Sequence, residues 1–167
     1  MITVLLINLA LSLLINIIGF SIAFYLKTDK LTDFSYALSF IALATISLII
    51  SGNFNLPNFI LLSLVTLWAV RLASYLVIRI RRWGKDRRFD DKRSNFVKFL
   101  GFWVFQAITV WFVLISSILF FFENQSSNLE IANYAGILIF VIGLVIEAFA
   151  DLQLYNFTGN KKNRRIY

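Results

Sequence analysis

The chain has 167 residues, of which 59% are hydrophobic and only 15% are charged, and its formal net charge is +7. Soluble domains are typically about half apolar and about a quarter charged, so this composition predicts an integral membrane protein. The chain contains no Cys and no His, which excludes disulfides, thiol nucleophiles, Cys/His zinc sites and histidine-ligated haem. We expect no metal site, and we expect the basic residues to meet anionic lipid headgroups instead of nucleic acid.

The first three apolar segments are residues 2–26, 34–50 and 56–78. Each is close to the roughly 20 residues that cross about 30 Å of hydrocarbon as a helix. The first segment has no Lys or Arg before its apolar stretch and no A-x-A-like site after it, so it is not predicted to be a signal peptide. The third contains one charge, Arg71, and begins near the only proline, Pro57, where a missing N–H costs little.

Two further apolar segments, residues 99–122 and 131–154, complete the set. The fourth segment is uncharged, whereas the fifth contains Glu147 and Asp151. Because only helices and closed barrels satisfy their backbone polar groups in lipid, and these segments have helical length, the pattern predicts an all-α polytopic bundle. We expect about five transmembrane helices that form a single transmembrane domain.

The basic residues lie on one side of the predicted membrane. All of the 16 Lys and Arg residues except Arg71 follow the first, third or fifth segment, and the largest group lies in the predicted loop at residues 79–98. The turns at residues 51–55 and 123–128 contain neither Lys nor Arg. The positive-inside rule therefore predicts an outside N-terminus, a cytoplasmic basic loop and a cytoplasmic C-terminus.

The charges inside the predicted spans are candidate functional residues, because a charge within a span is costly and usually faces a partner or a wet cavity. Arg71 and Glu147 each lie about 12 Å from the inner end of their own helix, and Tyr75 and Asp151 lie one turn further along. If the third and fifth helices pack together, Arg71 faces Glu147 and Tyr75 faces Asp151. This arrangement predicts either a polar cavity open to the cytoplasm or an ion pair that only fixes helix packing.

Two stretches of the sequence resemble a known family. They are Trp68-Ala-Val-Arg71-Leu-Ala-Ser-Tyr75, followed by Trp83-Gly84 and Asp86-Arg-Arg88-Phe89-x-x-x-Arg93, and Gly143-Leu-Val-Ile-Glu147-Ala-Phe-Ala-Asp151-Leu-Gln153-Leu-Tyr-Asn-Phe157. In this order they are similar to the steroid 5-alpha-reductase-domain family, which includes many uncharacterised bacterial membrane proteins. The resemblance covers about residues 68–157 and implies a multi-pass protein of the bacterial cytoplasmic membrane.

In the characterised reductases of that family, NADPH delivers hydride to an activated carbon–carbon double bond of a small lipophilic substrate. The resemblance implies that NADPH is the cofactor, that Trp68 lies on the substrate side, and that the cofactor contacts are supplied by Arg71, Tyr75, Arg79, Arg82, Glu147 and Asp151. Arg79 and Arg82 would approach the phosphates, where guanidinium forks suit the geometry. Asp151 would contact the adenosine or nicotinamide side, and the catalytic residue itself is not identified.

The sequence also departs from the family pattern. Trp68 stands where the steroid enzymes carry a substrate-side Tyr, and an indole N–H cannot replace a phenol as a proton donor. Glu147 stands where they tend to have Asn, and Phe89 replaces the usual Tyr of the loop motif. The family continues into a segment resembling Trp-Arg-Tyr-Ser-Arg-His-Pro-Asn-Tyr, whereas this chain ends at Tyr167. We therefore expect a C-terminally truncated or split member that is incomplete and can be inactive alone.

Three alternatives to a reductase remain open from the sequence. A membrane methyltransferase of the isoprenylcysteine carboxyl methyltransferase type would bind S-adenosylmethionine. A non-catalytic membrane protein would use its internal charges only to hold helices together. A transporter would line a polar path with the same charges, although no inverted repeat and no pair of broken helices is evident.

Overall fold

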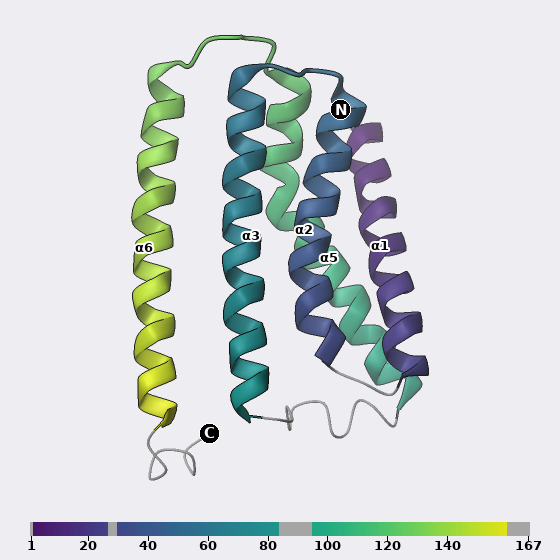
Figure 1. Ribbon diagram of the computed structural model, residues 1–167. Coiled ribbons are helices and arrows are strands. Elements are labelled where there is room, and N and C mark those ends of the chain that lie inside the picture. Colours follow the sequence, from purple (N-terminus) through teal and green to yellow (C-terminus); the bar gives the residue numbers. More distant parts are fainter. Residues whose placement is uncertain (1, 27–29, 84–94, 160–167) are drawn as a thin grey trace. The chain divides into compact units, whose positions relative to one another are not determined.

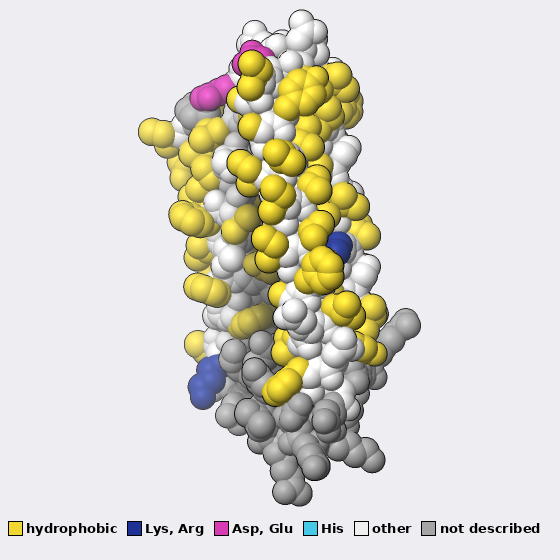
Figure 2. All heavy atoms as spheres, turned by 90° about the vertical axis from the view of Figure 1, so that its left-hand side faces the viewer, with side chains coloured by type: hydrophobic (Ala, Val, Ile, Leu, Met, Phe, Trp, Pro, Cys, Tyr) yellow, Lys and Arg dark blue, Asp and Glu magenta, His cyan; other side chains and the backbone are white. Residues whose placement is uncertain are grey.

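A computed structural model of the chain describes residues 2–26, 30–83 and 95–159. Over these residues the regular secondary structure is α-helix, as the sequence predicts: α1 (Ile2–Tyr25), α2 (Lys30–Ser51), α3 (Leu56–Trp83), α5 (Phe96–Glu123) and α6 (Ile131–Gly159) (Figure 1). All 5 helices are long and apolar enough to cross a membrane. Hydrophobic side chains are spread along the face seen in Figure 2 between its two ends, with a Lys or Arg side chain among them. These features define a multi-pass helical membrane protein.

The helices belong to two compact units, Met1–Ser127 and Asn128–Tyr167. The first unit contains α1, α2, α3 and α5, and the second contains α6. Within the first unit α2 packs against α1, α3 and α5, and α1 also packs along α5. Within this unit, successive helices run in opposite directions (Figure 1). We call the end where α3 stops and α5 starts the basic end, and the other end the asparagine end.

Four helices, α2, α3, α5 and α6, extend further than their predicted apolar segments, and two of them flank the predicted basic loop. Helix α3 continues through residues 79–83 to Trp83, and α5 begins at Phe96, so both flanks of the predicted basic loop are helical. Arg is a good helix former, and its charged head can reach water while its backbone stays helical, which explains the extension of α3. At the start of α5, the Asn95 side chain accepts a hydrogen bond from the Lys98 backbone N–H at 3.1 Å and caps the helix.

An apolar core lies between α2, α3 and α5. Its fully buried members are Phe40, Leu43, Ala44, Leu48, Ala69, Val110, Leu114, Ile118 and Phe121. Partly buried hydrophobic residues from α1, α2, α3 and α5 pack against this cluster. The core therefore fixes α3 against the rest of the unit through its contact with α2.

A line of buried polar residues joins α1, α2 and α5, and we call it the polar seam: Asn8, Ser12, Asn16, Ser39, Ser47 and Gln106. Asn16 lies at its centre. Its carboxamide donates to the Ser12 backbone carbonyl at 2.9 Å and to Ser39 Oγ at 3.4 Å, and its Oδ1 accepts from Gln106 Nε2 at 3.0 Å. One side chain of α1 therefore connects to both neighbouring helices.

The seam continues along α1 toward the asparagine end. Ser12 Oγ donates to the Ala107 backbone carbonyl of α5 at 2.8 Å, and Ser47 Oγ of α2 donates to Asn8 Oδ1. Near the same end of α1, Trp111 Nε1 donates to the Leu5 carbonyl at 2.9 Å. Lipid tails are as apolar as Leu, so apolar surface alone gives little drive for helix association in a membrane. Interhelical hydrogen bonds of this kind supply both attraction and register.

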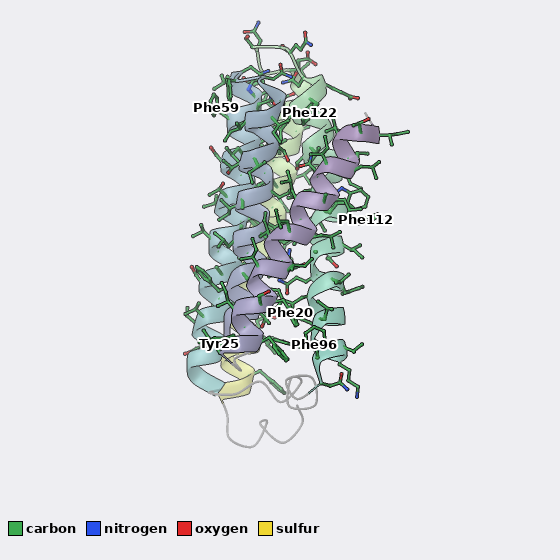
Figure 3. The ribbon with its side chains drawn as sticks, turned by 90° about the vertical axis from the view of Figure 1, so that its right-hand side faces the viewer. Phe20, Tyr25, Phe59, Phe96, Phe112 and Phe122 are labelled. Carbon is green, nitrogen blue, oxygen red and sulfur yellow. The ribbon has the colours of Figure 1, made fainter. Side chains whose placement is uncertain are left out.

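Toward the basic end, α1 and α5 approach closely at Gly19. A Cβ at this position would lie 2.5 Å from Trp103 Cζ3, and Trp103 is fully buried. Beside this contact, the Phe20 ring meets the Phe96 ring edge-on at 5.4 Å and the Phe99 ring at 5.6 Å. Figure 3 shows Phe20 and Phe96 side by side near the end of α1. The absence of a side chain at Gly19 is what allows this aromatic packing.

At the asparagine end, a short turn at residues 52–55 joins α2 to α3. Gly52 adopts φ of 68°, a conformation that glycine adopts without steric cost. Asn53 Nδ2 then donates to the Phe121 and Phe122 carbonyls at 3.0 and 3.2 Å, and Asn58 Nδ2 donates to the Asn53 carbonyl at 2.8 Å. The turn therefore satisfies carbonyls in the last turn of α5 that have no partner within their own helix.

The close approach at Gly19 generates a first prediction. We expect Gly19→Ala to destabilise the protein by about 1–3 kcal/mol, because the new methyl group forces Trp103 to move in a packed interface. The measurement is the midpoint of unfolding in detergent micelles. Gly101→Ala in α5 is the matched control, since a Cβ there meets no atom within 4 Å. Equal midpoints for the two variants would contradict the prediction.

The polar seam generates a second prediction. We expect Asn16→Ala to cost about 1–2 kcal/mol of unfolding free energy, because Gln106 Nε2 loses its acceptor inside the bundle. Unfolding of reconstituted protein by a denaturing detergent measures the difference. The control is Ser21→Ala on the same helix, where the exposed hydroxyl bonds only to the Ile17 carbonyl one turn earlier. A larger loss for Ser21→Ala would disprove the assigned role of Asn16.

Candidate cofactor-binding face of α3

One face of α3 carries the site residues predicted in that helix. Trp68, Arg71 and Tyr75 are spaced by three and four residues, so their side chains share one side of the helix. Because α3 is unbroken as far as Trp83, the backbone positions of Arg79 and Arg82 continue the same spacing toward the basic end. The side chains of Arg79 and Arg82 lie outside the part of the chain that the structure describes. We call these five positions the α3 stripe.

Trp68 is held at the edge of the apolar core. Its indole is partly buried, packs against the core cluster, and meets the buried Phe40 ring edge-on at 4.9 Å with an interplanar angle of 85°. Phe40 also meets the Tyr36 ring edge-on at 5.1 Å and 78°. Such edge-to-face pairs contribute about 0.5–1.5 kcal/mol beyond the area they bury. The Trp68 ring is therefore fixed by an aromatic row that runs along α2.

Arg71 and Tyr75 are both partly buried. Ala69, which is fully buried, marks the side of α3 that packs in the core. Leu67, Val70 and Ile78 mark the opposite side, with about half of each side chain exposed. By helical geometry Arg71 lies nearly opposite Ala69, on the same side of the helix as Leu67 and Ile78. A guanidinium at this depth in an apolar span can offer up to five N–H donors to a polar ligand.

Glu147 and Asp151 lie one turn apart on α6, as their spacing requires, so the two carboxyl groups share one side of that helix. They belong to the second compact unit, and the α3 stripe belongs to the first. The predicted convergence of Arg71 with Glu147, and of Tyr75 with Asp151, therefore stays a prediction. Among the described residues no group of three or more acidic side chains could hold a metal ion.

Sequence reasoning missed the polar seam entirely. It searched the spans for charges, and Asn, Ser and Gln carry none. A signal was present in α1, where Asn8, Ser12 and Asn16 recur every four residues in a segment that is otherwise apolar. That spacing puts all three on one face, which is the buried face of α1 in the structure. Their hydrogen bonds join α1 to its neighbouring helices, and the seam shares no residue with the predicted site.

The architecture and the α3 stripe together define the class: a multi-pass α-helical membrane protein with an ionisable group inside a span. Residues 19–167 match the DUF1295 family, whose description reads "Protein of unknown function". Since this match covers most of the chain, the protein belongs to the DUF1295 family. Comparison with curated proteins and with solved structures gave no match to this chain.

The aromatic row generates a third prediction. A double-mutant cycle with Phe40→Leu and Trp68→Leu should give a coupling free energy of about 0.5–1.5 kcal/mol, because each ring loses its edge-on partner. Unfolding in detergent micelles measures each corner of the cycle. The matched control is the Phe54–Phe59 pair, whose rings are 6.2 Å apart and about half exposed. If the control pair couples as strongly as Phe40 and Trp68, the row does not fix the indole.

Proposed function

We propose that this protein is a membrane-embedded, NADPH-dependent reductase of the steroid 5-alpha-reductase type. The observation that carries the proposal is the α3 stripe, in which Trp68, Arg71 and Tyr75 share one face of an unbroken helix with the positions of Arg79 and Arg82. Membership of the DUF1295 family is compatible with this reading, and the sequence resemblance described above supplies the reaction class. When bound, NADPH would supply hydride to an activated carbon–carbon double bond.

The donor chemistry of the stripe fits such a cofactor. Guanidinium groups form paired hydrogen bonds with phosphate oxygens, and they stay protonated in proteins. Three Arg positions at intervals of three to eight residues on one helix face span more than one turn, which suits an extended diphosphate. The phenol of Tyr75 adds a group that both donates and accepts. These groups would be costly to hold inside a span without a polar ligand or partner.

Each residue then has a proposed role. Arg79 and Arg82 would bind phosphate oxygens at the basic end, while Arg71 and Tyr75 would hold the cofactor deeper in the span. Asp151 would accept hydrogen bonds from cofactor hydroxyl or amide groups, and Glu147 would support the same region from α6. Trp68 would line the substrate side. The positive-inside rule predicts that the basic end faces the cytoplasm, from which the cofactor would enter.

A small lipophilic substrate is the natural partner for this arrangement. The outer faces of the helices are apolar, and a lipophilic molecule dissolved in the bilayer can reach Trp68 at the edge of the core without crossing water. Anionic headgroups would bind the positively charged loops at the same end. The substrate would therefore come from the membrane and the cofactor from the aqueous phase.

The fourth prediction concerns cofactor binding. We expect Arg71→Ala to weaken NADPH binding by about 10-fold or more, since a hydrogen bond to a charged group contributes about 1.5–3 kcal/mol. Equilibrium dialysis of detergent-solubilised full-length protein against NADPH gives the dissociation constant. Lys98→Ala is the matched control, because Lys98 is exposed in the first turn of α5 and lies outside the stripe.

The same preparation separates the other functions. Heat stability measured with NADPH and with S-adenosylmethionine distinguishes a reductase from a methyltransferase, because a ligand stabilises only the protein that binds it. Absence of NADPH binding by the unmodified chain, or equal dissociation constants for Arg71→Ala and Lys98→Ala, would end the proposal. A charge-swapped pair, Arg71→Glu with Glu147→Arg, that restores both expression and function would assign the charges to helix packing alone.

A further inference from the structure

We propose that an internal water molecule binds between Trp103 and Gln106, on the side of α5 that packs against α1. Both side chains are buried in α5, with 0% and 5% of their surface exposed. The water accepts a hydrogen bond from the Trp103 indole N–H and donates one to the Gln106 side-chain carbonyl. The site is independent of the reductase function proposed above.

The Trp103 indole supplies a donor that has no acceptor in the protein. Its Nε1 atom is buried and has no hydrogen-bond partner among the described residues. The benzene part of the indole is held against Gly19 of α1, where Cζ3 and Cη2 are the nearest atoms. A buried N–H without an acceptor costs the free energy of removing it from water. Groups of this kind are the usual partners of buried water in proteins.

The Gln106 carboxamide supplies a matching acceptor one turn away. Gln106 Nε2 donates to Asn16 Oδ1 at 3.0 Å, and among the described contacts its Oε1 accepts no hydrogen bond. Residues three apart on a helix are neighbours, and a helical side chain leans over the turn before its own Cα. The Gln106 carboxamide therefore lies over the turn that carries Trp103.

A water molecule pairs both groups at once. It is an acceptor for the Trp103 N–H and a donor for the Gln106 carbonyl, and a buried water is held by two to four polar partners. With this water bound, the polar seam extends by one turn toward the basic end. The hydrogen-bonded part of the interface between α1 and α5 then reaches the close approach at Gly19.

The competing partner for the indole N–H is the Phe99 ring. The Phe99 and Trp103 rings are perpendicular, with centroids 6.2 Å apart. A contact between an N–H and an aromatic face is weaker than a hydrogen bond to oxygen, and it leaves the Gln106 carbonyl without a donor. Water is the occupant that pairs both buried groups.

NMR of the indole protons tests the site directly. Full-length protein with ¹⁵N-labelled Trp side chains is studied in deuterated detergent micelles, and Trp→Phe variants assign the signals. We expect a cross-peak between water and the Trp103 N–H in a rotating-frame Overhauser spectrum, with the sign of through-space transfer and not of chemical exchange. Trp111 is the internal control, because its Nε1 donates to the Leu5 carbonyl at 2.9 Å, and we expect no such cross-peak for it.

Removing the acceptor provides the second readout. We expect Gln106→Leu to abolish the Trp103 cross-peak and Thr109→Val to keep it. The Thr109 hydroxyl is the matched control, because it is exposed on the same helix and bonds to the Phe105 carbonyl one turn earlier. A cross-peak that stays unchanged in Gln106→Leu would overturn the site.

The spectrum of the unmodified protein decides the proposal even if Gln106→Leu does not fold. Absence of the Trp103 cross-peak from that spectrum would overturn the bound water. A Trp103 N–H signal shifted upfield, without a cross-peak to water, would assign the Phe99 ring as its partner instead.

Discussion

The hydrogen bonds of Asn16 hold the four-helix unit in its observed arrangement. In lipid the usual hydrophobic drive between helices is absent, so polar contacts and close packing have to select which faces meet. Asn16 contacts α2 through Ser39 and α5 through Gln106, which fixes three helices from one residue. Ser12, one turn away along α1, bonds to α5, and Asn8, two turns away, bonds to α2. A carboxamide without these partners would be costly in hydrocarbon, so alternative packings of α1 are disfavoured.

The position of α3 follows from that arrangement. The helix is attached to the unit mainly through α2, by apolar contacts and the Phe40–Trp68 pair. The residues of the polar seam belong to α1, α2 and α5, and the Arg71 side of α3 faces away from its buried Ala69 side. Within this unit, the helix that carries the ionisable group is therefore held mainly by α2. This division between a polar structural seam and a separate polar stripe would let the two evolve independently.

Much of the architecture could be predicted from the sequence, because the length of each apolar run shows that a helix formed by it can span a bilayer. The end of α3 could not be read from hydropathy, since Arg residues end an apolar run without ending a helix. The grouping of Trp68, Arg71 and Tyr75 follows from spacing on a single helix. Their predicted pairing with Glu147 and Asp151 depends on more than spacing. Spacing shows which residues share a face of one helix, but it does not show which helices are neighbours.

The turn at the asparagine end limits where the chain can be lengthened. Residues 52–55 use their side chains and backbone to complete the last turn of α5, so an inserted epitope there would uncover the Phe121 and Phe122 carbonyls. Gln125 and Ser127, just after α5, are exposed and take no part in those bonds. A reporter inserted at residues 125–127 would therefore label the same side of the membrane while leaving the bundle closed. This makes the connection after α5 the suitable place to establish which side of the membrane the asparagine end occupies.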